Sequence, residues 1–499
     1  MTTAKFVQGP ILRHILVMSS TAAVGISALF VVDLIDIFFL SLLGEQELAA
    51  AVGYAGTISF FTTSIGIGLS IALGALVSRA IGAKEFELAK RLLLNSAVMT
   101  LLVAVFVAIV VTLFIPELLA LVGATGRTAE LAADYLYILV PSMPLICLAM
   151  ALGAALRAVG DAKLSMVSTL TGGGVNLVFD PIFIFLFAMG IEGAAVASVL
   201  ARVAVLVVAA RGVIIKHKLF GRFQFSHFKA DIGAIFAIAA PAMLTNIATP
   251  IGNAVVTRAI ADFGDSYVAA WAVLGRLTPV AFGMIFALSG AIGPIVGQNF
   301  GAREFERVKE SLTKALLFCG GYVLLVSIIL FALQEQIIIV FDMHGDGAEL
   351  IRFFCSYIAV FFVFSGALFV ANASFNNLGK AKYSTLFNVG KATLGTIPFV
   401  YYGAQWGGVE GVLIGQVIGT IVFAALGVWT AYRLVDKVQS TSVFYTSKDD
   451  EYDELNEELS PSSPNPLSSS CAQMAQISEE QDCEASNRVT ELVSGSRRD

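Results

Sequence analysis

The stretch Gly82–Glu87 reads Gly-Ala-Lys-Glu-Phe-Glu, and it recurs almost unchanged at Gly301–Glu306 as Gly-Ala-Arg-Glu-Phe-Glu. The offset between the two copies is 219 residues. Gly160–Lys163 (Gly-Asp-Ala-Lys) recurs at the same offset as Gly379–Lys382 (Gly-Lys-Ala-Lys). Self-similarity at a fixed offset in separate segments indicates an internal repeat. The sequence therefore predicts two halves of the same architecture.

The segments between these short motifs are strongly apolar. Of the 499 residues, 57% are hydrophobic and 14% are charged, and the mean hydropathy is +0.83. A soluble domain carries about 25% charged residues, so this composition indicates an integral membrane protein. Because a membrane helix needs about 20 apolar residues, we expect an all-α protein with twelve spans, near residues 15–43, 48–78, 92–115, 130–157, 164–188, 191–214, 232–262, 266–296, 311–333, 349–375, 384–404 and 408–434.

Six spans in each copy give the two halves the same orientation, so the repeats are parallel. Such halves enclose a cavity between them, and rocking of one half against the other alternates access to it. We divide the chain into a first six-helix lobe (1–215), a cytoplasmic linker (216–231), a second six-helix lobe (232–437) and a tail (438–499). The tail joins an acidic run to a Ser- and Pro-rich stretch, and we predict that it is disordered.

The loops alternate in basic content. Lys and Arg gather in every second loop, for example at Lys84, Lys218 and Arg303, whereas the opposite loops are acidic, as at Glu117 and Asp342. By the positive-inside rule, we predict a multi-pass protein of the cell inner membrane with both termini in the cytoplasm.

Other large classes of protein are not favoured. The five cysteines and four histidines form no spacing typical of a metal site, a disulfide framework or a catalytic centre. We therefore expect neither an enzyme nor a nucleic-acid-binding protein, and no cofactor apart from a coupling ion. The expected partners are small organic molecules and the lipid bilayer, and the expected state is a monomer.

One carboxylate lies deep inside a predicted span. The stretch 176–185 reads Asn-Leu-Val-Phe-Asp-Pro-Ile-Phe-Ile-Phe, with Asp180 well inside the span at 164–188. A charged side chain at the centre of a membrane helix costs about 2.5 to 3.5 kcal/mol, which makes it a functional candidate. Asn176 lies one turn earlier on the same face. Pro181 removes a helical hydrogen bond and so loosens the helix beside the acid.

The first span adds two more acids, Asp33 and Asp36, which lie three residues apart on one face. Their mutual repulsion and their burial both disfavour the charged form, which suits a proton carrier. Sodium is the competing use of the same oxygens, since hard cations take carboxylate, amide and hydroxyl ligands. Ser198 in the sixth span adds a hydroxyl. The positions equivalent to Asp36 and Asp180 in the second half are Val256 and Phe399, so the polar cluster belongs to one half only.

The second half carries cations within its spans instead. We expect Arg276 and Lys391 to face the central cavity, together with Asn372, and to contact the transported molecule. Arg202 and Arg258 are expected to extend their side chains to the membrane surface.

The stretch Asp36–Gly44 (Asp-Ile-Phe-Phe-Leu-Ser-Leu-Leu-Gly), with the duplicated Gly-Ala loops, resembles the multidrug and toxic compound extrusion (MATE) family over about residues 10–436. Asn176-x-x-x-Asp180-Pro181 with Ser198 is similar to its DNA-damage-inducible (DinF-like) branch. There, a first-span Asp, a fifth-span Asn and Asp and a sixth-span hydroxyl form the cation site. The resemblance implies a fold with a V-shaped cavity between the lobes and a site at Asp36, Asn176, Asp180 and Ser198; at Asp33 that branch often has an amide.

Two departures from the family pattern affect the mechanism. Thr245, Asn246 and Asn372 occupy the neighbourhoods where the other branch has carboxylates in its second half, which favours coupling in the first half. Where the family often has a proline early in the first span, this chain reads Ser19-Ser20-Thr21, so we do not expect a proline-dependent bend.

The resemblance implies a secondary active antiporter that exports organic, often cationic and amphipathic compounds in exchange for protons, with sodium as the second choice of ion. The alternative is a flippase for lipids or lipid-linked oligosaccharides in the same superfamily. A major-facilitator transporter also has two six-span halves, but its loop signature after the second span is missing.

Overall fold

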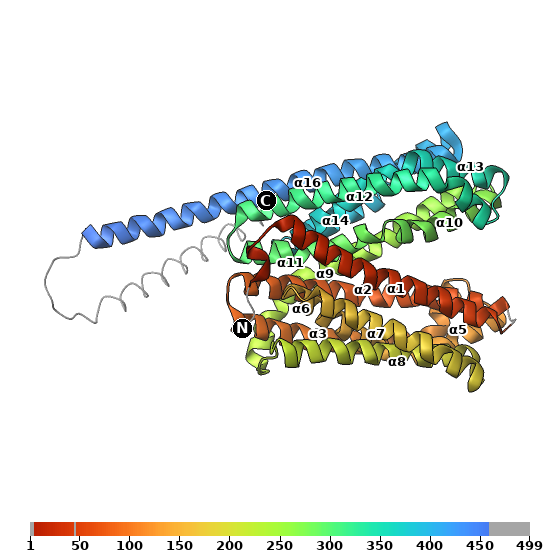
Figure 1. Ribbon diagram of the computed structural model, residues 1–499, viewed down its shortest axis with the longest axis horizontal. Coiled ribbons are helices and arrows are strands. Elements are labelled where there is room, and N and C mark those ends of the chain that lie inside the picture. Colours follow the sequence, from red (N-terminus) through yellow and green to blue (C-terminus); the bar gives the residue numbers. More distant parts are fainter. Residues whose placement is uncertain (1–3, 44–45, 459–499) are drawn as a thin grey trace, which may run out of the picture. The chain divides into compact units, whose positions relative to one another are not determined.

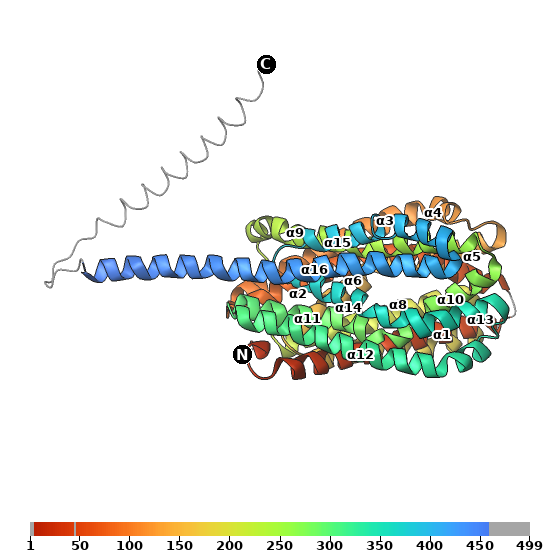
Figure 2. The ribbon, with the colours of Figure 1, turned by 90° about the horizontal axis from the view of Figure 1, so that it is seen from above.

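The computed structural model describes residues 4–43 and 46–458. Its elements are all helices, which confirms the predicted all-α class (Figure 1). The chain divides into two units, Met1–Val438 and Gln439–Asp499. In the first unit the long helices run side by side, as the two views agree (Figures 1 and 2).

The helices of the first half are η1 (Lys5–Val7), α1 (Ile11–Ser41), α2 (Gln46–Gly82), α3 (Phe86–Leu113), α4 (Ile115–Leu121), α5 (Gly126–Leu139), η2 (Val140–Ser142), α6 (Met143–Ala158), α7 (Ala162–Pro181), η3 (Ile182–Leu186), α8 (Gly190–Arg211) and η4 (Gly212–Lys216). Those of the second half are α9 (Phe225–Ala261), α10 (Asp265–Ala281), α11 (Gly283–Gly301), α12 (Phe305–Val340), α13 (Gly345–Phe353), η5 (Phe354–Ile358), η6 (Ala359–Phe361), α14 (Phe362–Asn377), α15 (Lys382–Ala392) and α16 (Ile397–Glu458).

Eleven helical runs among the described residues are long and apolar enough to cross a membrane, where the sequence predicts twelve spans. The difference lies in the last run, Lys382–Ser440, which contains both of the spans predicted at 384–404 and 408–434. Within it the backbone leaves helical geometry at Gly407 and Gly408, and Gly408 has a φ of +59°. A positive φ carries no steric cost for glycine, so two helices meet there across a kink.

Helices extend into two segments that lie outside the predicted spans, the linker and the tail. α9 begins at Phe225, inside the predicted linker 216–231, because the buried carboxylate of Asp231 accepts hydrogen bonds from Arg91 and Asn95 and so anchors the helix to α3. α16 continues to Glu458, into the predicted disordered tail. Extending an existing helix avoids the cost of nucleating a new one. Residues 459–499 lie outside the described part of the chain.

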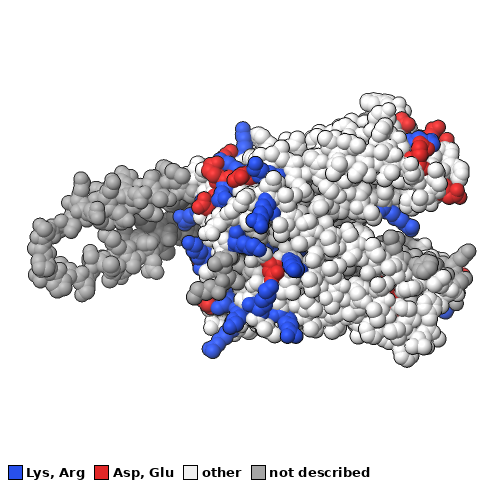
Figure 3. Space-filling model, viewed as in Figure 1, with Lys and Arg blue, Asp and Glu red and all other residues white. Residues whose placement is uncertain are grey.

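Basic side chains gather at one end of the first unit (Figure 3). We call it the basic end; its members include the exposed residues Lys84, Lys163, Lys216, Arg303 and Lys380, which lie at or just beyond helix ends. This arrangement is the one that the alternating loop charges predict.

The duplicated Gly-Ala loops explain why the halves meet closely at the basic end. A Cβ atom added to Gly82 would collide with the backbone of Gln298, and one added to Gly301 would collide with the backbone of Arg79. The ends of α2 and α11 therefore approach each other backbone to backbone through glycine, once in each direction. The first glycine of each loop copy serves this reciprocal packing.

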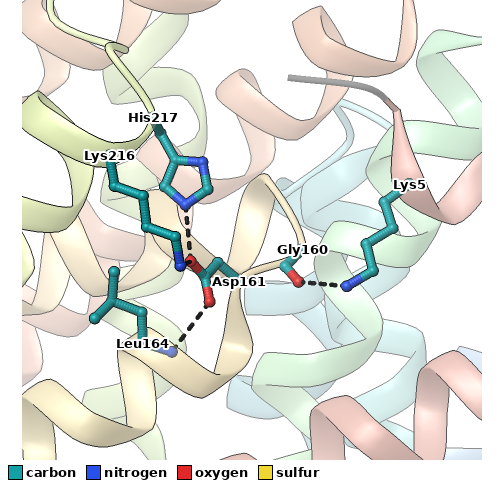
Figure 4. Close-up of polar contacts among 6 residues, drawn as sticks. All are labelled: Lys5, Gly160, Asp161, Leu164, Lys216 and His217. Atoms are coloured by element: carbon teal, nitrogen blue, oxygen red, sulfur yellow. Dashed lines mark hydrogen bonds and ion pairs between the residues drawn. The ribbon is translucent and has the colours of Figure 1, made fainter. Parts of the chain in front are cut away.

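The N-terminal segment joins the two halves at the same end. The backbone N–H of Phe6 donates to Gln298 Oε1 over 2.8 Å, and Gln298 Nε2 donates to the carbonyl of Ala158 over 2.7 Å. Lys5 Nζ donates to the carbonyl of Gly160 over 3.1 Å (Figure 4). Phe6 and Gln298 are fully buried, so this contact between the N-terminal segment and α11 is part of the protein interior.

Asp161 caps the helix that carries the central acid. Its carboxylate accepts a hydrogen bond from the backbone N–H of Leu164 in the first turn of α7, over 3.2 Å. The same carboxylate contacts Lys216 Nζ at 2.6 Å and His217 Nε2 at 2.8 Å (Figure 4). The start of α7 is thus tied to the end of the sixth span.

Candidate functional site

Consecutive glycines bring α7 close to its neighbours one turn before the site. A Cβ atom on Gly172 would collide with the side chain of Val205 on α8 and lie 3.3 Å from the carbonyl oxygen of Ala201. A Cβ atom on Gly173 would lie 3.2 Å from Val32 Cγ2 on α1. Because glycine has no side chain at these two positions, the polar residues of α7 come within hydrogen-bonding reach of α1.

The amide of Asn176 bridges two carboxylates on different helices. Its Nδ2 lies 2.9 and 2.8 Å from the two oxygens of Asp36 on α1, and 2.9 Å from Oδ2 of Asp180 on α7. Asp180 is fully buried and Asn176 is 4% exposed. The structure therefore brings together three of the predicted site residues: Asp36, Asn176 and Asp180.

Two oxygens of this cluster are left without a partner. Asn176 Oδ1 and Asp180 Oδ1 are buried and make no hydrogen bond to any described residue. A buried polar atom without a partner costs about 1 to 3 kcal/mol. Two carboxylates held together in a buried site favour binding of a proton or a cation, because they repel each other when both are charged. Asp180 Oδ1 can take a proton, and carboxylate and amide oxygens are both ligands of hard cations such as sodium.

Ser198 makes a different contact from the one expected. It lies on α8 and is hydrogen-bonded to Tyr135 of α5, a residue that sequence reasoning missed. Tyr135 is close enough to Asp36 and Asp180 to interact with them electrostatically. Tyr135 is one of two tyrosines in α5 and gives no sequence signal for this role, because only the packing of α5 on α8 selects it.

The helix changes form directly after the acid. Pro181 ends the regular part of α7, and η3 continues it as a π-helical turn. Proline has no N–H to donate, so the hydrogen-bond register shifts there, as the sequence predicts. Such π-helical turns are frequent at functional sites.

The remaining candidates are placed as follows. The side chain of Asp33 lies outside the described residues. The expectation that Arg202 extends to the membrane surface is wrong: Arg202 Nη1 donates to Leu139 O and Ser142 Oγ over 2.9 and 2.8 Å. The guanidinium points into the protein because the carbonyl of Leu139 and the hydroxyl of Ser142 accept its hydrogen bonds there. Arg258 is exposed and 3.9 Å from Asp262.

The second-half candidates do not form one cluster. Arg276 is exposed on α10, Lys391 is half-buried on α15, and Asn372 is buried on α14. Asn372 Oδ1 accepts a hydrogen bond from Asn388 Nδ2 over 2.9 Å. No described contact joins Arg276, Lys391 and Asn372 to one another.

Comparison with known proteins identifies the family. The family model MatE matches twice, at residues 22–182 and 241–402. The two matches begin 219 residues apart, the same offset as the duplicated loops. The chain belongs to the MatE family. MATE is a transporter family, so this protein is a multi-pass membrane transporter and not an enzyme.

The relatives of this MATE protein differ in what they carry. It is 28% identical to the FAD transporter of Shewanella oneidensis, over 87% of this chain and 97% of the relative. It is 23% identical to the multidrug export protein MepA of Staphylococcus aureus, over 87% of this chain and 96% of that protein.

Solved structures agree with the fold. A crystal structure of the Vibrio cholerae MATE transporter VcmN matches with a TM-score of 0.80 and 25% identity, over 85% of this chain and 96% of that one. A transporter of the MOP superfamily from Pyrococcus furiosus matches with a TM-score of 0.81 and 23% identity, over 87% and 98%.

Proposed function

We propose that this MATE protein is a secondary active efflux antiporter that exchanges organic compounds for protons at Asp36, Asn176 and Asp180. The observation that carries the proposal is the bridge from one amide nitrogen to both carboxylates, beside two buried oxygens that have no hydrogen-bond partner among the described residues. The Asn176 amide contacts both acids but cannot remove their mutual repulsion. A proton bound between the acids neutralises part of this charge, and its release restores the repulsion.

This change in charge gives the protein two states to alternate between. Binding a proton stabilises the close packing of α1 on α7, and losing it favours a rearrangement that opens the path for cargo. The membrane potential can drive this exchange, because one charge moving through 100 mV supplies about 2.3 kcal/mol. The position equivalent to Asp180 in the second half is Phe399, which supports coupling in one half only.

We assign the basic end to the cytoplasm. Lys and Arg concentrate there, and the positive-inside rule places such loops on the cytoplasmic side of a cell inner membrane. η1, near the N-terminus, lies at this end, with Lys5 bonded to Gly160. The basic loops between later spans support the same side for the C-terminus.

The cargo we propose is amphipathic organic compounds, including cationic ones, in keeping with the multidrug relative MepA. A second candidate cargo is FAD, the molecule named for the relative from Shewanella oneidensis. The observation that favours it is Lys391, an ammonium within a membrane span of the second half that has no ion pair with any described residue.

The test is transport of ethidium and of FAD by the purified protein in proteoliposomes, under an imposed proton gradient and separately under a sodium gradient. We expect accumulation of at least one cargo with the proton gradient. Accumulation with sodium alone would contradict proton coupling while leaving the antiporter. Movement of neither cargo under either gradient would contradict the antiporter and favour a flippase.

A further inference from the structure

A stripe of polar side chains runs along one face of α15. Ser384, Asn388 and Lys391 follow at helical spacings of four and three residues, so they share one face. Ser384 is fully buried and Asn388 is 5% exposed, which shows that this face turns into the protein. Lys391 points the same way and is half-buried. Its side chain therefore extends from the buried polar face of α15.

Contacts from two other helices fix this stripe in place. Asn388 Nδ2 donates to Asn372 Oδ1 on α14 over 2.9 Å. The hydroxyl of Ser384 lies 3.3 Å from that of Thr245 on α9. The polar face of α15 is thus held between α9 and α14, and Lys391 lies one turn beyond Asn388.

Lys391 lies well inside the predicted span 384–404, close to a break in the helix. It follows Lys382, the exposed first residue of α15, by nine positions, or about 14 Å along an α-helix. That depth is close to half of a hydrocarbon core about 30 Å thick. α15 ends at Ala392 and α16 begins at Ile397, and the hydroxyl of Thr396 donates to the carbonyl of Lys391 over 2.8 Å. Helices that break at mid-membrane are found at the binding sites of transporters.

No described acid pairs with this ammonium. Among the described residues, Lys391 has no ion pair, and no charged side chain acts on it from nearby. Throughout the second half, Asp and Glu lie at or near the ends of the predicted spans or in loops, as at Asp262, Glu335 and Glu410. A cation at this depth costs about 2.5 to 3.5 kcal/mol when it is unpaired. Binding of an anion beside the ammonium would offset this unfavourable free energy.

We propose that Lys391 is the specificity-determining residue of an anion-binding subsite in the second half, which receives a carboxylate or phosphate group of the cargo. The inference rests on the proposed function, because it assigns a chemical class of cargo to the same transporter. It gives the halves separate tasks: the acids of the first half hold the coupling ion, and the ammonium of the second half holds an organic anion.

The test measures equilibrium binding without any ion gradient. Carboxyfluorescein serves as the anionic probe and ethidium as the cationic one, and fluorescence anisotropy gives Kd for the purified protein. We expect Lys391→Met to weaken carboxyfluorescein binding at least tenfold, whereas Lys391→Arg stays within threefold of the wild type. Ethidium binding should be unchanged or tighter in Lys391→Met. The matched control is Lys382→Met, which removes an exposed lysine from the same helix and should leave both Kd values unchanged.

Two outcomes would overturn the subsite. One is a carboxyfluorescein Kd of Lys391→Met within twofold of the wild type; the other is an equal loss of ethidium binding, which would indicate general damage. Failure of the proposed function gives a different result. Binding that depends on Lys391, in a protein that moves no cargo under a proton or a sodium gradient, would contradict the antiporter and leave the subsite in place.

Discussion

The amide of Asn176 is the group that joins the two carboxylates of the candidate site. Its Nδ2 contacts three carboxylate oxygens within 2.9 Å and has two hydrogens to donate, and a hydrogen bond to a charged group contributes about 1.5 to 3 kcal/mol. Without these hydrogen bonds, α1 should pack less tightly on α7 around Asp36. We predict that Asn176→Ala lowers the initial rate of proton-driven ethidium transport about tenfold or more, since about 1.4 kcal/mol corresponds to a factor of ten.

The matched control for this change is Asn246→Ala. Asn246 lies on α9 and donates to the carbonyl of Ala242 in its own helix, so its loss should leave the transport rate near that of the wild type. Equal rates for Asn176→Ala and the wild type would remove the amide from the mechanism.

Asp161 should make the stability of the protein depend on pH. Burial alone would raise the pKa of this carboxyl group. Hydrogen bonds from Lys216, His217 and the backbone of Leu164 together lower the pKa by more than burial raises it, so the pKa lies below its usual value. A carboxyl group whose pKa is lower when folded stabilises the protein above its unfolded pKa of about 3.9 and loses that effect as the pH falls through its folded pKa.

We therefore predict that Asp161→Asn, which keeps a capping side chain but removes the charge that faces Lys216 and His217, lowers the melting temperature in detergent at pH 7 by the loss of up to about 1 kcal/mol. The difference from the wild type should shrink as the pH falls below about 4. A difference that stays constant from pH 7 to the lowest pH at which the wild type remains folded would show that the charge of Asp161 is not involved.

α7 depends on its glycines for its place in the bundle. In Gly172→Leu a side chain must fit where the Cβ atom already collides with Val205 and approaches the backbone of Ala201. Overpacking of this kind costs about 1 to 3 kcal/mol, so we predict a lower melting temperature and a lower transport rate. Gly174→Leu is the control, because Gly174 is exposed and a Cβ atom there meets nothing within 4 Å. Equal melting temperatures for the two variants would contradict close packing at Gly172.

The sequence is informative about helix α7 because its signals are local. Asn176, Asp180 and Pro181 lie within six residues of one helix, and the π-helical turn after Pro181 follows from the missing N–H. Tyr135 could not be found in this way, since its contact with Ser198 depends on how α5 packs on α8. The inward turn of Arg202 depends in the same way on acceptors of other elements, Leu139 and Ser142.

The duplication could be predicted for the molecule as a whole, because two loop motifs repeat at one offset. The hydrogen bond from Phe6 of η1 to Gln298 of α11 could not be predicted, since these residues are 292 positions apart and neither belongs to a recognisable motif. The kink at Gly407 and Gly408 lies where the predicted spans 384–404 and 408–434 meet, so the position of this junction could be predicted from the sequence.

Transport by alternating access requires the halves to separate at the basic end. Ser78 Oγ on α2 donates to Asn377 Oδ1 on α14 over 3.3 Å, across the two halves. In a background without cysteines, we predict that the double variant Ser78→Cys with Asn377→Cys nearly loses ethidium transport on oxidation and regains it with dithiothreitol. Each single variant, oxidised in the same way, is the control. Full transport by the cross-linked double variant would contradict opening at this end.

Proton release on cargo binding is the most direct measurement of the coupling site. Ethidium or carboxyfluorescein is added to the purified protein in weakly buffered solution with a pH indicator, and binding is followed in parallel by anisotropy. The wild type should release protons when cargo binds, and Asp36→Asn should bind cargo and release none. Asp262→Asn, which changes an exposed acid at a helix end, should release as many protons as the wild type. Equal release by Asp36→Asn and the wild type, or binding to the wild type without release, would contradict a proton exchanged at Asp36, Asn176 and Asp180.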